Sequence, residues 1–493
     1  MKKLSYILFL LLAKSTLTYA ISIVAMEKTT LSADGKGYTR KSITYNSSFK
    51  YPIQQSSEIY AIDSSGTKTN LIKRKRFIGD HIIIKLKDGA SRLELEKLNS
   101  KQGAFVRRKL FSKNTFLVAI SNVQIDAVNN LASQYSAATN IIKYAEPDYM
   151  VELQDTNPND HYYTNGVMWS RSKIECAKAW DLCTGTGGVI VAIIDSGIEY
   201  THPDLAANIW TNPGETGIDS NGVGMATNGI DDDANGFIDD IHGWNFCNNG
   251  NNDPMDDFYH GTRCAGEVGA VGNNVIGIVG VGWNIRLMAM KFIDSAGHGT
   301  VSDAIECFDY VTMMRQKGIN VRITSNSWTD DNYSSALEDA VKDNRDLGIL
   351  CIAAAGNKTE NIDVNPVYPA CFDLDNVVCV TGTDINDELY TNIVGVGAVN
   401  VDLAAPARNV YLTNIGGHYG ISSGTSYATP IVAGTAALIW EKAPHLKYQD
   451  VFKAIMDGVD PIASMQGKSV SGGRLNVYKA LRHIPYGGLI SIK

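Results

Sequence analysis

Ser426 has the surroundings of a catalytic nucleophile. It stands in the motif Gly-Thr-Ser-Tyr-Ala-Thr-Pro at residues 424–430, and the apolar run 431–439 that follows predicts a buried helix. The serine would then lie in the first helical turn, where unpaired N–H groups and the positive end of the helix dipole stabilise negative charge on a substrate oxygen. Because serine is also a common helix N-cap, this hypothesis depends on partner residues elsewhere in the chain.

Three further polar residues are expected to gather at one edge of a sheet. Asp195 ends the apolar run 189–194, and Asn357 closely follows the apolar run 350–355. His260 opens a helix of small residues, and an imidazole has a pKa that suits a general base. A single Asp at the end of a strand is most often a cap or turn residue. Because ligands bind at the carboxyl ends of parallel strands, the three side chains together predict a catalytic site.

The four motifs together resemble those of the subtilisin-like serine proteases. Asp195 stands in Ile-Asp-Ser-Gly and His260 in His-Gly-Thr-Arg-Cys-Ala-Gly. Asn357 stands in Ala-Ala-Gly-Asn, and Ser426 follows in the family order of Asp, His and Ser. The resemblance covers about residues 160–480. It implies that Ser426 attacks the peptide carbonyl, that His260 moves the proton and that Asp195 orients the imidazole. Asn357 would stabilise the oxyanion of the tetrahedral intermediate.

The same resemblance predicts how a peptide substrate is held. In this family the substrate backbone is bound as an added strand between two segments, with pockets for its side chains. The matching residues of this sequence are Gly297, Gly299, Ser327, Trp328, Ala354 and Gly356. Thr329 replaces the glycine that is usual at its position, so we expect a narrowed pocket for the residue before the cut.

Cys264 follows His260 by four residues and should therefore lie on the same helix face, beneath the imidazole. The motif around it resembles the kexin-like branch of the family, which would imply cleavage after paired basic residues. Too few residues follow Ser426 for the additional β domain of that branch. The expected maturation junction at 151–155 also lacks a basic pair. A general endopeptidase is thus favoured over a kexin-like processing enzyme.

An acidic loop between the Asp and His motifs predicts a calcium site rather than a merely solvated loop. Residues 231–240 place oxygen-bearing side chains at alternate positions around a glycine. The closing glutamate of an EF-hand is missing, with His242 at its position. The expected ligands are the side chains of Asp231, Asp233, Asn235 and Asp239. A second calcium site, implied by the family resemblance, would use Asp204 and Asn274 with main-chain oxygens of residues 272–278.

Uniformly apolar strands alternate with helices in the central part of the chain. After the run at 189–194, such strands are expected at 286–293, 319–325, 348–355 and 377–382. This pattern is typical of an α/β fold in which a parallel β-sheet carries helices on both faces. We therefore predict a subtilisin-like peptidase domain over residues 154–485 and a C-terminal tail at 486–493.

The N-terminal part of the sequence has the organisation of a secreted zymogen. Residues 1–20 combine a basic start with a short apolar run, as a signal peptide does. Residues 21–80 form a polar pro-region to which no fold is assigned, and their basic run at 73–76 is interpreted as a solvated loop. Residues 81–153 predict a small α+β module of ferredoxin-like βαββαβ topology. The family resemblance implies that this module is an inhibitory propeptide, released by self-cleavage near 151–155, whereas an adhesion or carrier module is the alternative.

Charge and cysteine content narrow the class further. The formal net charge of -8 argues against nucleic acid or an anionic membrane as a partner, and no apolar run is long enough for a membrane span. Some of the eight cysteines should pair in an oxidising compartment, with Cys176/Cys183 and Cys371/Cys379 favoured by their proximity in sequence. The spacing of Cys and His argues against zinc. We expect a monomer, secreted or held in a secretory-pathway organelle, that acts on proteins or peptides.

Two other classes of protein would explain part of the sequence. Asp195-Ser-Gly is also the motif of aspartic proteases, but no second copy flanked by apolar residues occurs. A catalytically silent, calcium-binding relative of the subtilisin-like enzymes is the other alternative, although all four catalytic residues are present. The sequence therefore favours a secreted serine endopeptidase made as an autoprocessed zymogen.

Overall fold

The computed structural model describes residues 22–32, 37–46, 53–62, 69–150, 156–218, 222–389 and 394–484. The chain divides into two compact units, Met1–Leu153 and Gln154–Lys493, and each is described by itself. The predicted signal peptide at 1–20, the maturation junction at 151–155 and the tail at 486–493 lie outside the described residues.

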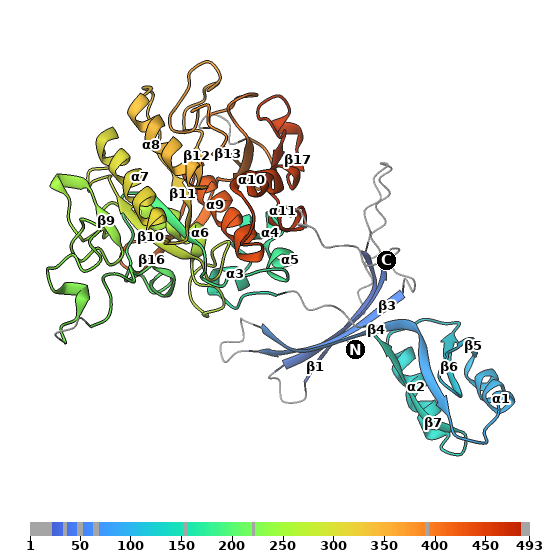
Figure 1. The fold of residues 1–493 in the computed structure, drawn as a ribbon. Helices are drawn as coiled ribbons and strands as arrows, with labels where there is room; N and C mark the ends of the chain where they lie inside the picture. The colour runs from blue at the N-terminus through green and yellow to red at the C-terminus, as the bar shows by residue number, and fades with distance from the viewer. Residues whose placement is uncertain are drawn as a thin grey trace, which may run out of the picture. The chain divides into compact units, whose positions relative to one another are not determined.

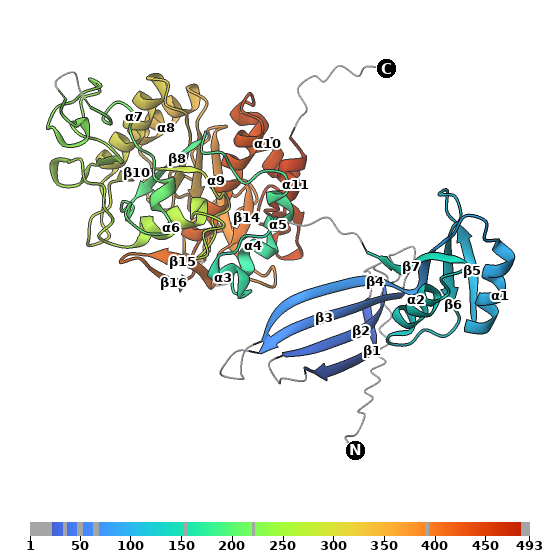
Figure 2. The ribbon, with the colours of Figure 1, turned by 90° about the horizontal axis from the view of Figure 1, so that it is seen from below.

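The first unit begins with a long antiparallel sheet (Figure 1; Figure 2). Its strands pair in chain order and are β1 (Ser22–Leu31), β2 (Gly37–Asn46), β3 (Ile53–Ile62) and β4 (Thr69–Leu86). The described residues of the region 21–80, to which no fold could be assigned from sequence, are thus largely in strands. The predicted loop at 73–76 is wrong, because Lys73 pairs with Ile59 and Arg76 pairs with Ser56 in this sheet.

The rest of this unit is a βαββαβ arrangement built on the end of β4. Its further elements are α1 (Arg92–Gln102), β5 (Ala104–Lys109), β6 (Thr115–Ile120), α2 (Ala127–Ala137) and β7 (Ile142–Tyr149). The strand order is β7-β4-β6-β5, and each of these pairs is antiparallel. Ile82, Val118 and Tyr135 are buried in one core between this sheet and the two helices.

A nine-stranded sheet forms the centre of the second unit, in the order β17-β18-β14-β13-β12-β11-β8-β10-β9. Its strands are β8 (Ile190–Asp195), β9 (Gly243–Asn245), β10 (Arg286–Lys291), β11 (Val321–Asn326), β12 (Leu350–Ala354), β13 (Val377–Thr383), β14 (Leu403–Pro406), β17 (Asp460–Pro461) and β18 (Gly473–Arg474). All neighbours are parallel except β17 and β18. Because β10 and β11 lie on opposite sides of β8, the strand order reverses there, which creates a crevice at the carboxyl ends of the strands.

Helices cover both faces of this sheet, so the predicted α/β fold is confirmed. One face carries α6 (His260–Gly269), α9 (Thr425–Lys442) and α10 (Tyr448–Asp457), and the other carries α7 (Val301–Gln316) and α8 (Ser335–Asp346). The remaining elements are α3 (His161–Thr164), α4 (Trp169–Lys173), α5 (Cys176–Trp180), α11 (Val477–Arg482), the hairpin of β15 (Val410–Asn414) and β16 (His418–Ser422), and the short 3-10 helices η1 (Ala206–Asn208), η2 (Met225–Thr227), η3 (Cys247–Asn249) and η4 (Ala463–Met465).

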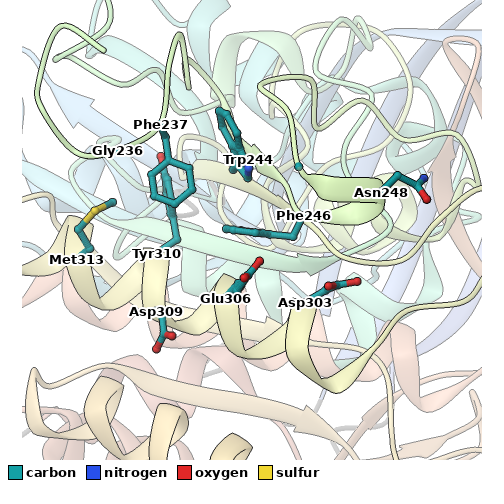
Figure 3. A pocket seen from close by; sticks show the side chains of 11 residues that line it. Gly236, Phe237, Trp244, Phe246, Asn248, Asp303, Glu306, Asp309, Tyr310 and Met313 are labelled. Carbon is teal, nitrogen blue, oxygen red and sulfur yellow. The ribbon is translucent and has the colours of Figure 1, made fainter.

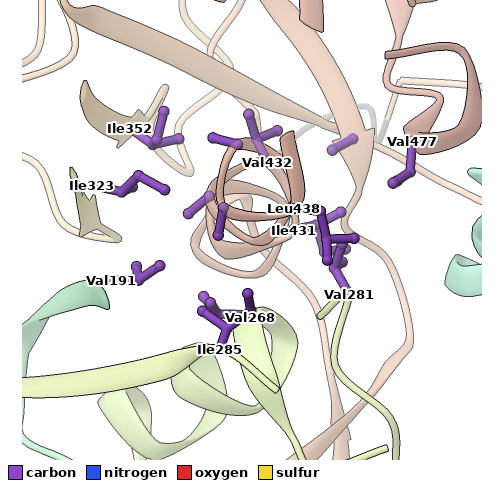
Figure 4. Packing of buried hydrophobic residues seen from close by; sticks show 14 of the residues in the cluster. Val191, Val268, Val281, Ile285, Ile323, Ile352, Ile431, Val432, Leu438 and Val477 are labelled. Atoms are coloured by element: carbon purple, nitrogen blue, oxygen red, sulfur yellow. The ribbon is translucent and has the colours of Figure 1, made fainter. Parts of the chain in front are cut away.

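The central strand β8 contributes to two hydrophobic cores. Because successive side chains of a strand point to opposite faces, Val191 and Ile193 belong to the core that contains α9. Ala192 and Ile194 belong to the core that contains α7 and α8. Figure 4 shows α9 end-on, with Val191 and Val432 among the side chains that fill the space around it. All six residues of β8 are buried, which explains why the five residues before Asp195 are apolar.

The helix predicted after the Gly-Thr-Ser motif is α9, and Ser426 lies in its first turn. The helix is buried from Thr425 to Trp440. Its N-cap Gly424 has a φ of 152°, and a Cβ atom there would lie 3.3 Å from Oδ1 of Asn357. Glycine at this position therefore lets two loops of the site approach each other.

All eight cysteines are free thiols, so the two predicted pairings are wrong for this structure. Burial raises the pKa of Cys176 to about 12 and that of Cys379 well above its ordinary value, so both remain protonated. Cys371 instead accepts a hydrogen bond from the N–H of Val367 at 3.4 Å.

Within the described part of the chain, none of the helices combines the length and the apolar character that a membrane span requires.

Candidate active site

Asp195 and His260 form a hydrogen-bonded pair in the candidate site. Asp195 is the last residue of β8 and is fully buried, while His260 is the first residue of α6. Nδ1 of the imidazole lies 2.8 Å from Oδ1 and 3.0 Å from Oδ2 of the carboxylate. Burial lowers the pKa of His260, but the negative charge and the hydrogen bond of Asp195, together with contributions from Cys264, raise the pKa well above its ordinary value. With Nδ1–H bound to the carboxylate, Nε2 is the basic nitrogen of the neutral ring.

A buried carboxylate, Asp256, ties the turn after β8 to the first turn of α6. It accepts a hydrogen bond from the Ser196 hydroxyl at 2.9 Å. It also accepts from the N–H and the hydroxyl of Thr262, at 2.9 and 2.6 Å. Ser196 Oγ in turn accepts the N–H of Gly261 at 2.9 Å. These bonds fix the loop that carries the carboxylate against the helix that carries the imidazole.

Ser426 is held at the start of α9 by residues from two other segments. Its hydroxyl donates to the main-chain oxygen of Ser327 at 3.1 Å. Its own carbonyl accepts the Ser327 hydroxyl at 2.8 Å and the Cys264 thiol at 3.4 Å. That carbonyl is available because Pro430, four residues later, has no N–H to donate to it.

Cys264 contacts both the serine backbone and the imidazole. Its Sγ lies 4.0 Å from Nδ1 of His260, one helical turn away, as the sequence predicts. In the described part of the chain, the hydroxyl of Ser426 is bonded to Ser327 rather than to the imidazole. Catalytic hydrogen bonds are often long or poorly aligned before the substrate binds. The structure thus brings Ser426 and His260 to the same crevice. Cys264 lies between the main chain of Ser426 and the ring of His260.

The amide of Asn357 has a fixed orientation. Its Oδ1 accepts hydrogen bonds from the N–H of Thr425 at 2.8 Å and from the Thr425 hydroxyl at 3.0 Å. Among the described residues, Nδ2 of this exposed side chain has no hydrogen-bond partner. The donor group beside Ser426 is therefore free to bind an oxygen atom of a ligand.

A cavity of about 200 Å³ lies beside Asn357. Its lining includes Gly356 and Thr329, both of which the sequence analysis placed in the substrate pocket, together with Val367. Lys358 also lines the cavity and forms an ion pair with Asp331, with 2.6 Å between Nζ and Oδ2. The cavity is therefore bordered by three branched side chains, those of Thr329, Ile362 and Val367, by the charge pair and by Glu360.

The other predicted cleft residues lie in the segments that follow β10 and β11 and at the end of β12. Gly297 and Gly299 belong to an exposed turn after β10, closed by a hydrogen bond of 2.8 Å from the N–H of Asp294 to the carbonyl of His298. Trp328 follows β11 and packs edge-on against Phe292, with ring centroids 4.9 Å apart. Ala354, by contrast, is buried at the end of β12, and its neighbour Ala355 lines the cavity instead.

The acidic loop gathers only part of the predicted calcium-ligand set. Asp231 and Asp233 lie with Glu215 in one group whose oxygens are within 4.8 Å of one another. Asp239 is outside that group, and its carboxylate accepts the N–H of Gly229 at 3.1 Å.

Two further residues of this loop are occupied with each other. The Asn235 amide donates to Asp240 at 2.8 Å, and the Tyr310 hydroxyl donates to the same carboxylate. Burial raises the pKa of Asp240 to about 6. The Asn235 side chain therefore stabilises the conformation of the loop.

The second predicted calcium site contains an additional carboxylate. Nδ2 of Asn274 donates to Oδ1 of Asp204 at 2.7 Å. Asp160 is also fully buried and accepts the N–H of Asn273 at 2.7 Å. Burial raises the pKa of Asp204 to about 7, and the charge of Asp160 contributes to the shift. Two buried carboxylates thus face the same loop.

Among protein families, the subtilase family matches residues 186–471 of this chain. The chain belongs to the subtilase family. It is 30% identical over 367 residues to the thermophilic serine proteinase of Bacillus sp. (strain AK1). The aligned stretch covers 74% of this chain and 79% of that protein. It is 32% identical over 326 residues to thermitase of Thermoactinomyces vulgaris, covering 66% of this chain and 99% of thermitase.

Other relatives of this subtilase are longer or more distant. Subtilisin-like protease 1 of Plasmodium vivax is 33% identical over 345 residues, which is 66% of this chain but only 52% of that protein. A protease from Pseudoalteromonas arctica PAMC 21717 shares the fold, with a TM-score of 0.52, 24% identity, and coverage of 66% of this chain and 99% of that chain. The similarities indicate that this subtilase is a serine peptidase.

Sequence reasoning missed three acidic residues of this subtilase. Glu215 and Asp160 join the two candidate calcium sites from separate loops, and Asp256 links the two catalytic segments. None stands in a ligand pattern, since Glu215 lies in a turn and Asp160 in a stretch that resembles a linker. Their burial is the only feature that distinguishes them, because acidic side chains are rarely buried without a partner or an ion.

Proposed function

We propose that this subtilase is a serine endopeptidase that uses Ser426, His260 and Asp195 as nucleophile, base and orienting carboxylate. The observation that carries the proposal is the double contact of Asp195 with Nδ1 of His260, in the crevice that also holds Ser426. This contact fixes the tautomer and the ring plane, so that Nε2 is the atom that accepts a proton.

The reaction then follows from the positions of these groups. Ser426 Oγ bonds to the carbonyl carbon of the substrate as its proton passes to Nε2 of His260, and the carbonyl oxygen becomes an oxyanion. The proton is next delivered to the leaving amine as the C–N bond breaks, which leaves an acyl ester on Ser426. Water, deprotonated by His260, cleaves that ester and restores the hydroxyl.

Asn357 supplies an oxyanion donor in this scheme. Because Oδ1 is held by two hydrogen bonds from Thr425, Nδ2 is oriented before the substrate arrives. A donor that need not reorganise stabilises the transition state more than the ground state.

The cavity beside Asn357 supports cleavage after a residue with a small, uncharged side chain. Thr329, Ile362 and Val367 narrow it, and the carboxylates of Asp331, which pairs with Lys358, and of Glu360 at its border disfavour an acidic side chain. An aromatic side chain would have to displace these groups.

Two calcium sites are part of the proposal. Glu215, Asp231 and Asp233 offer carboxylate oxygens, which Ca²⁺ prefers, and Oε2 of Glu215 is buried without a hydrogen-bond partner among the described residues. Asp204 and Asp160 would bind a second ion with main-chain oxygens of the loop at 272–278. A bound ion would offset the cost of burying these charges and hold the loops in place.

The chain is further proposed to be a secreted zymogen. The module at 81–153, with its antiparallel order β7-β4-β6-β5, would be the ferredoxin-like inhibitory propeptide, released near 151–155 after removal of the signal peptide at 1–20. The mature peptidase would act as a monomer on proteins or peptides.

Peptide-library profiling of the purified chain tests the proposal, with Ser426→Ala as the control. We expect cleavage after small uncharged residues by the parent and none by the variant. N-terminal sequencing of the parent should give a start between residue 152 and about residue 165. Cleavage by Ser426→Ala, or activity that pepstatin blocks and a sulfonyl fluoride does not, would overturn the assignment.

A further inference from the structure

A large cavity lies between α7 and the segments on either side of β9, and none of the proposed catalytic residues lines it. Its volume is about 730 Å³. Phe237, Trp244, Phe246 and Tyr310 form an aromatic wall, as Figure 3 shows. The Phe237 ring packs edge-on against Trp244 and Tyr310, with centroids 4.9 and 5.0 Å apart. These contacts hold the aromatic wall in a fixed arrangement.

Carboxylates from α7 line the same cavity. They are Asp303, Glu306 and Asp309, whose spacing of three residues keeps them along one side of the helix. Figure 3 shows the Glu306 carboxylate pointing toward Phe246. Within the described chain, the three carboxylates make no ion pair or side-chain hydrogen bond, and no Lys, Arg or His lines the cavity. The negative charge of this groove is therefore not neutralised by its surroundings.

The chemistry of the groove fits an organic cation better than a metal ion. The clusters of acidic, thiol and imidazole ligands that come within 4.8 Å of one another in the described residues include none of these carboxylates. Aromatic faces attract guanidinium and ammonium groups, and carboxylates beside them add charge pairing. The volume of the cavity also suits a ligand with several chemical groups better than a single ion.

We propose that this aromatic and acidic groove binds a basic segment of a polypeptide substrate, with an Arg or Lys side chain against the rings and its charge facing Asp303 and Glu306. The inference rests on the proposed endopeptidase function for the identity of the polypeptide. Because the groove is separate from the catalytic residues, binding there tethers the substrate and lowers KM without changing the chemical step.

Fluorescence polarisation tests binding directly, in full-length Ser426→Ala protein that cannot use this serine for hydrolysis. The probes are a labelled peptide with an Arg-Arg pair and a matched peptide with Gln-Gln in its place. The groove variant Asp303→Asn/Glu306→Gln should bind the Arg-Arg peptide about tenfold more weakly. The control Asp339→Asn/Asp373→Asn, which removes two exposed carboxylates outside the groove, should bind it as the parent does.

Equal affinity for the Arg-Arg and Gln-Gln peptides would overturn the inference, as would equal losses in the groove and control variants. Raising the salt concentration should weaken binding of the Arg-Arg peptide only, because exposed charge pairs are screened.

Kinetics with active enzyme separate this inference from the proposed function. The two probes are extended by the same cleavable sequence. Asp303→Asn/Glu306→Gln should raise KM for the Arg-Arg substrate without changing its kcat. For the Gln-Gln substrate, neither KM nor kcat should change. A loss of kcat on both substrates would contradict docking in the groove. If neither substrate is cleaved but binding stays specific for Arg-Arg, the endopeptidase proposal fails and the groove remains a binding site for basic peptides.

Discussion

Replacing Asn357 with alanine should slow this subtilase while leaving its fold intact. The side chain is exposed, and its two hydrogen bonds with Thr425 join loops that are also held by buried backbone contacts. Loss of one oxyanion donor costs about 3 to 4 kcal/mol of transition-state stabilisation, or about 100- to 1000-fold in kcat. We therefore expect a large decrease in kcat, little change in KM and an unchanged melting temperature for Asn357→Ala.

Thr425→Val provides a graded comparison. It removes the hydroxyl bond of 3.0 Å to Oδ1 of Asn357 but keeps the main-chain bond of 2.8 Å. One lost hydrogen bond of about 1 kcal/mol corresponds to a roughly fivefold decrease in kcat. Steady-state kinetics on one peptide substrate, with thermal unfolding as the control for folding, measure both variants. Less than a tenfold loss of kcat in Asn357→Ala, or a loss confined to KM, would refute the oxyanion role.

Three further predictions concern the base, the metal sites and the pocket. Because the neutral imidazole is the base and Asp195 raises the pKa of His260, kcat/KM should rise with pH through a pKa above 6.5. Asp195→Asn should move this rise to lower pH and decrease kcat. A rise at unchanged pH in the variant would contradict the pairing of Asp195 with His260. Chelation of calcium should lower the melting temperature by roughly 5 °C. Glu215→Gln should weaken calcium binding measured by calorimetry, whereas Asp239→Asn, outside the carboxylate group, should not; equal effects would argue against this ligand set. Thr329→Gly should increase kcat/KM for substrates with a larger residue before the cut, and unchanged selectivity in library profiling would show that Thr329 does not narrow the pocket.

The catalytic residues could be located from sequence because each belongs to a short local pattern. Asp195 ends an apolar strand, His260 starts a helix and Ser426 comes two residues after Gly424, where Asn357 approaches closely. The backbone conformation and burial that these positions require also restrict the residues next to them in sequence. Each catalytic residue therefore stands in a short pattern that a single sequence reveals. The alternation of buried strands and helices was readable for the same reason.

The remaining parts of the site depend on contacts between distant segments. Glu215 reaches Asp231 across a loop, and Asp256 joins the two catalytic segments through Ser196, without any fixed spacing that sequence could reveal. The sheet at 22–86 was missed because polar residues fill its strands and hide their alternation. Cysteine pairing failed as a prediction because nearness in sequence does not set the geometry of two side chains.

Covalent labelling tests the central claim most directly. A serine-directed sulfonyl or phosphonyl fluoride, followed by peptide mapping with mass spectrometry, should modify Oγ of Ser426 in proportion to the loss of peptidase activity. The Ser426→Ala variant should be unlabelled and inactive. A label on another residue, or full activity after complete modification of Ser426, would contradict the account.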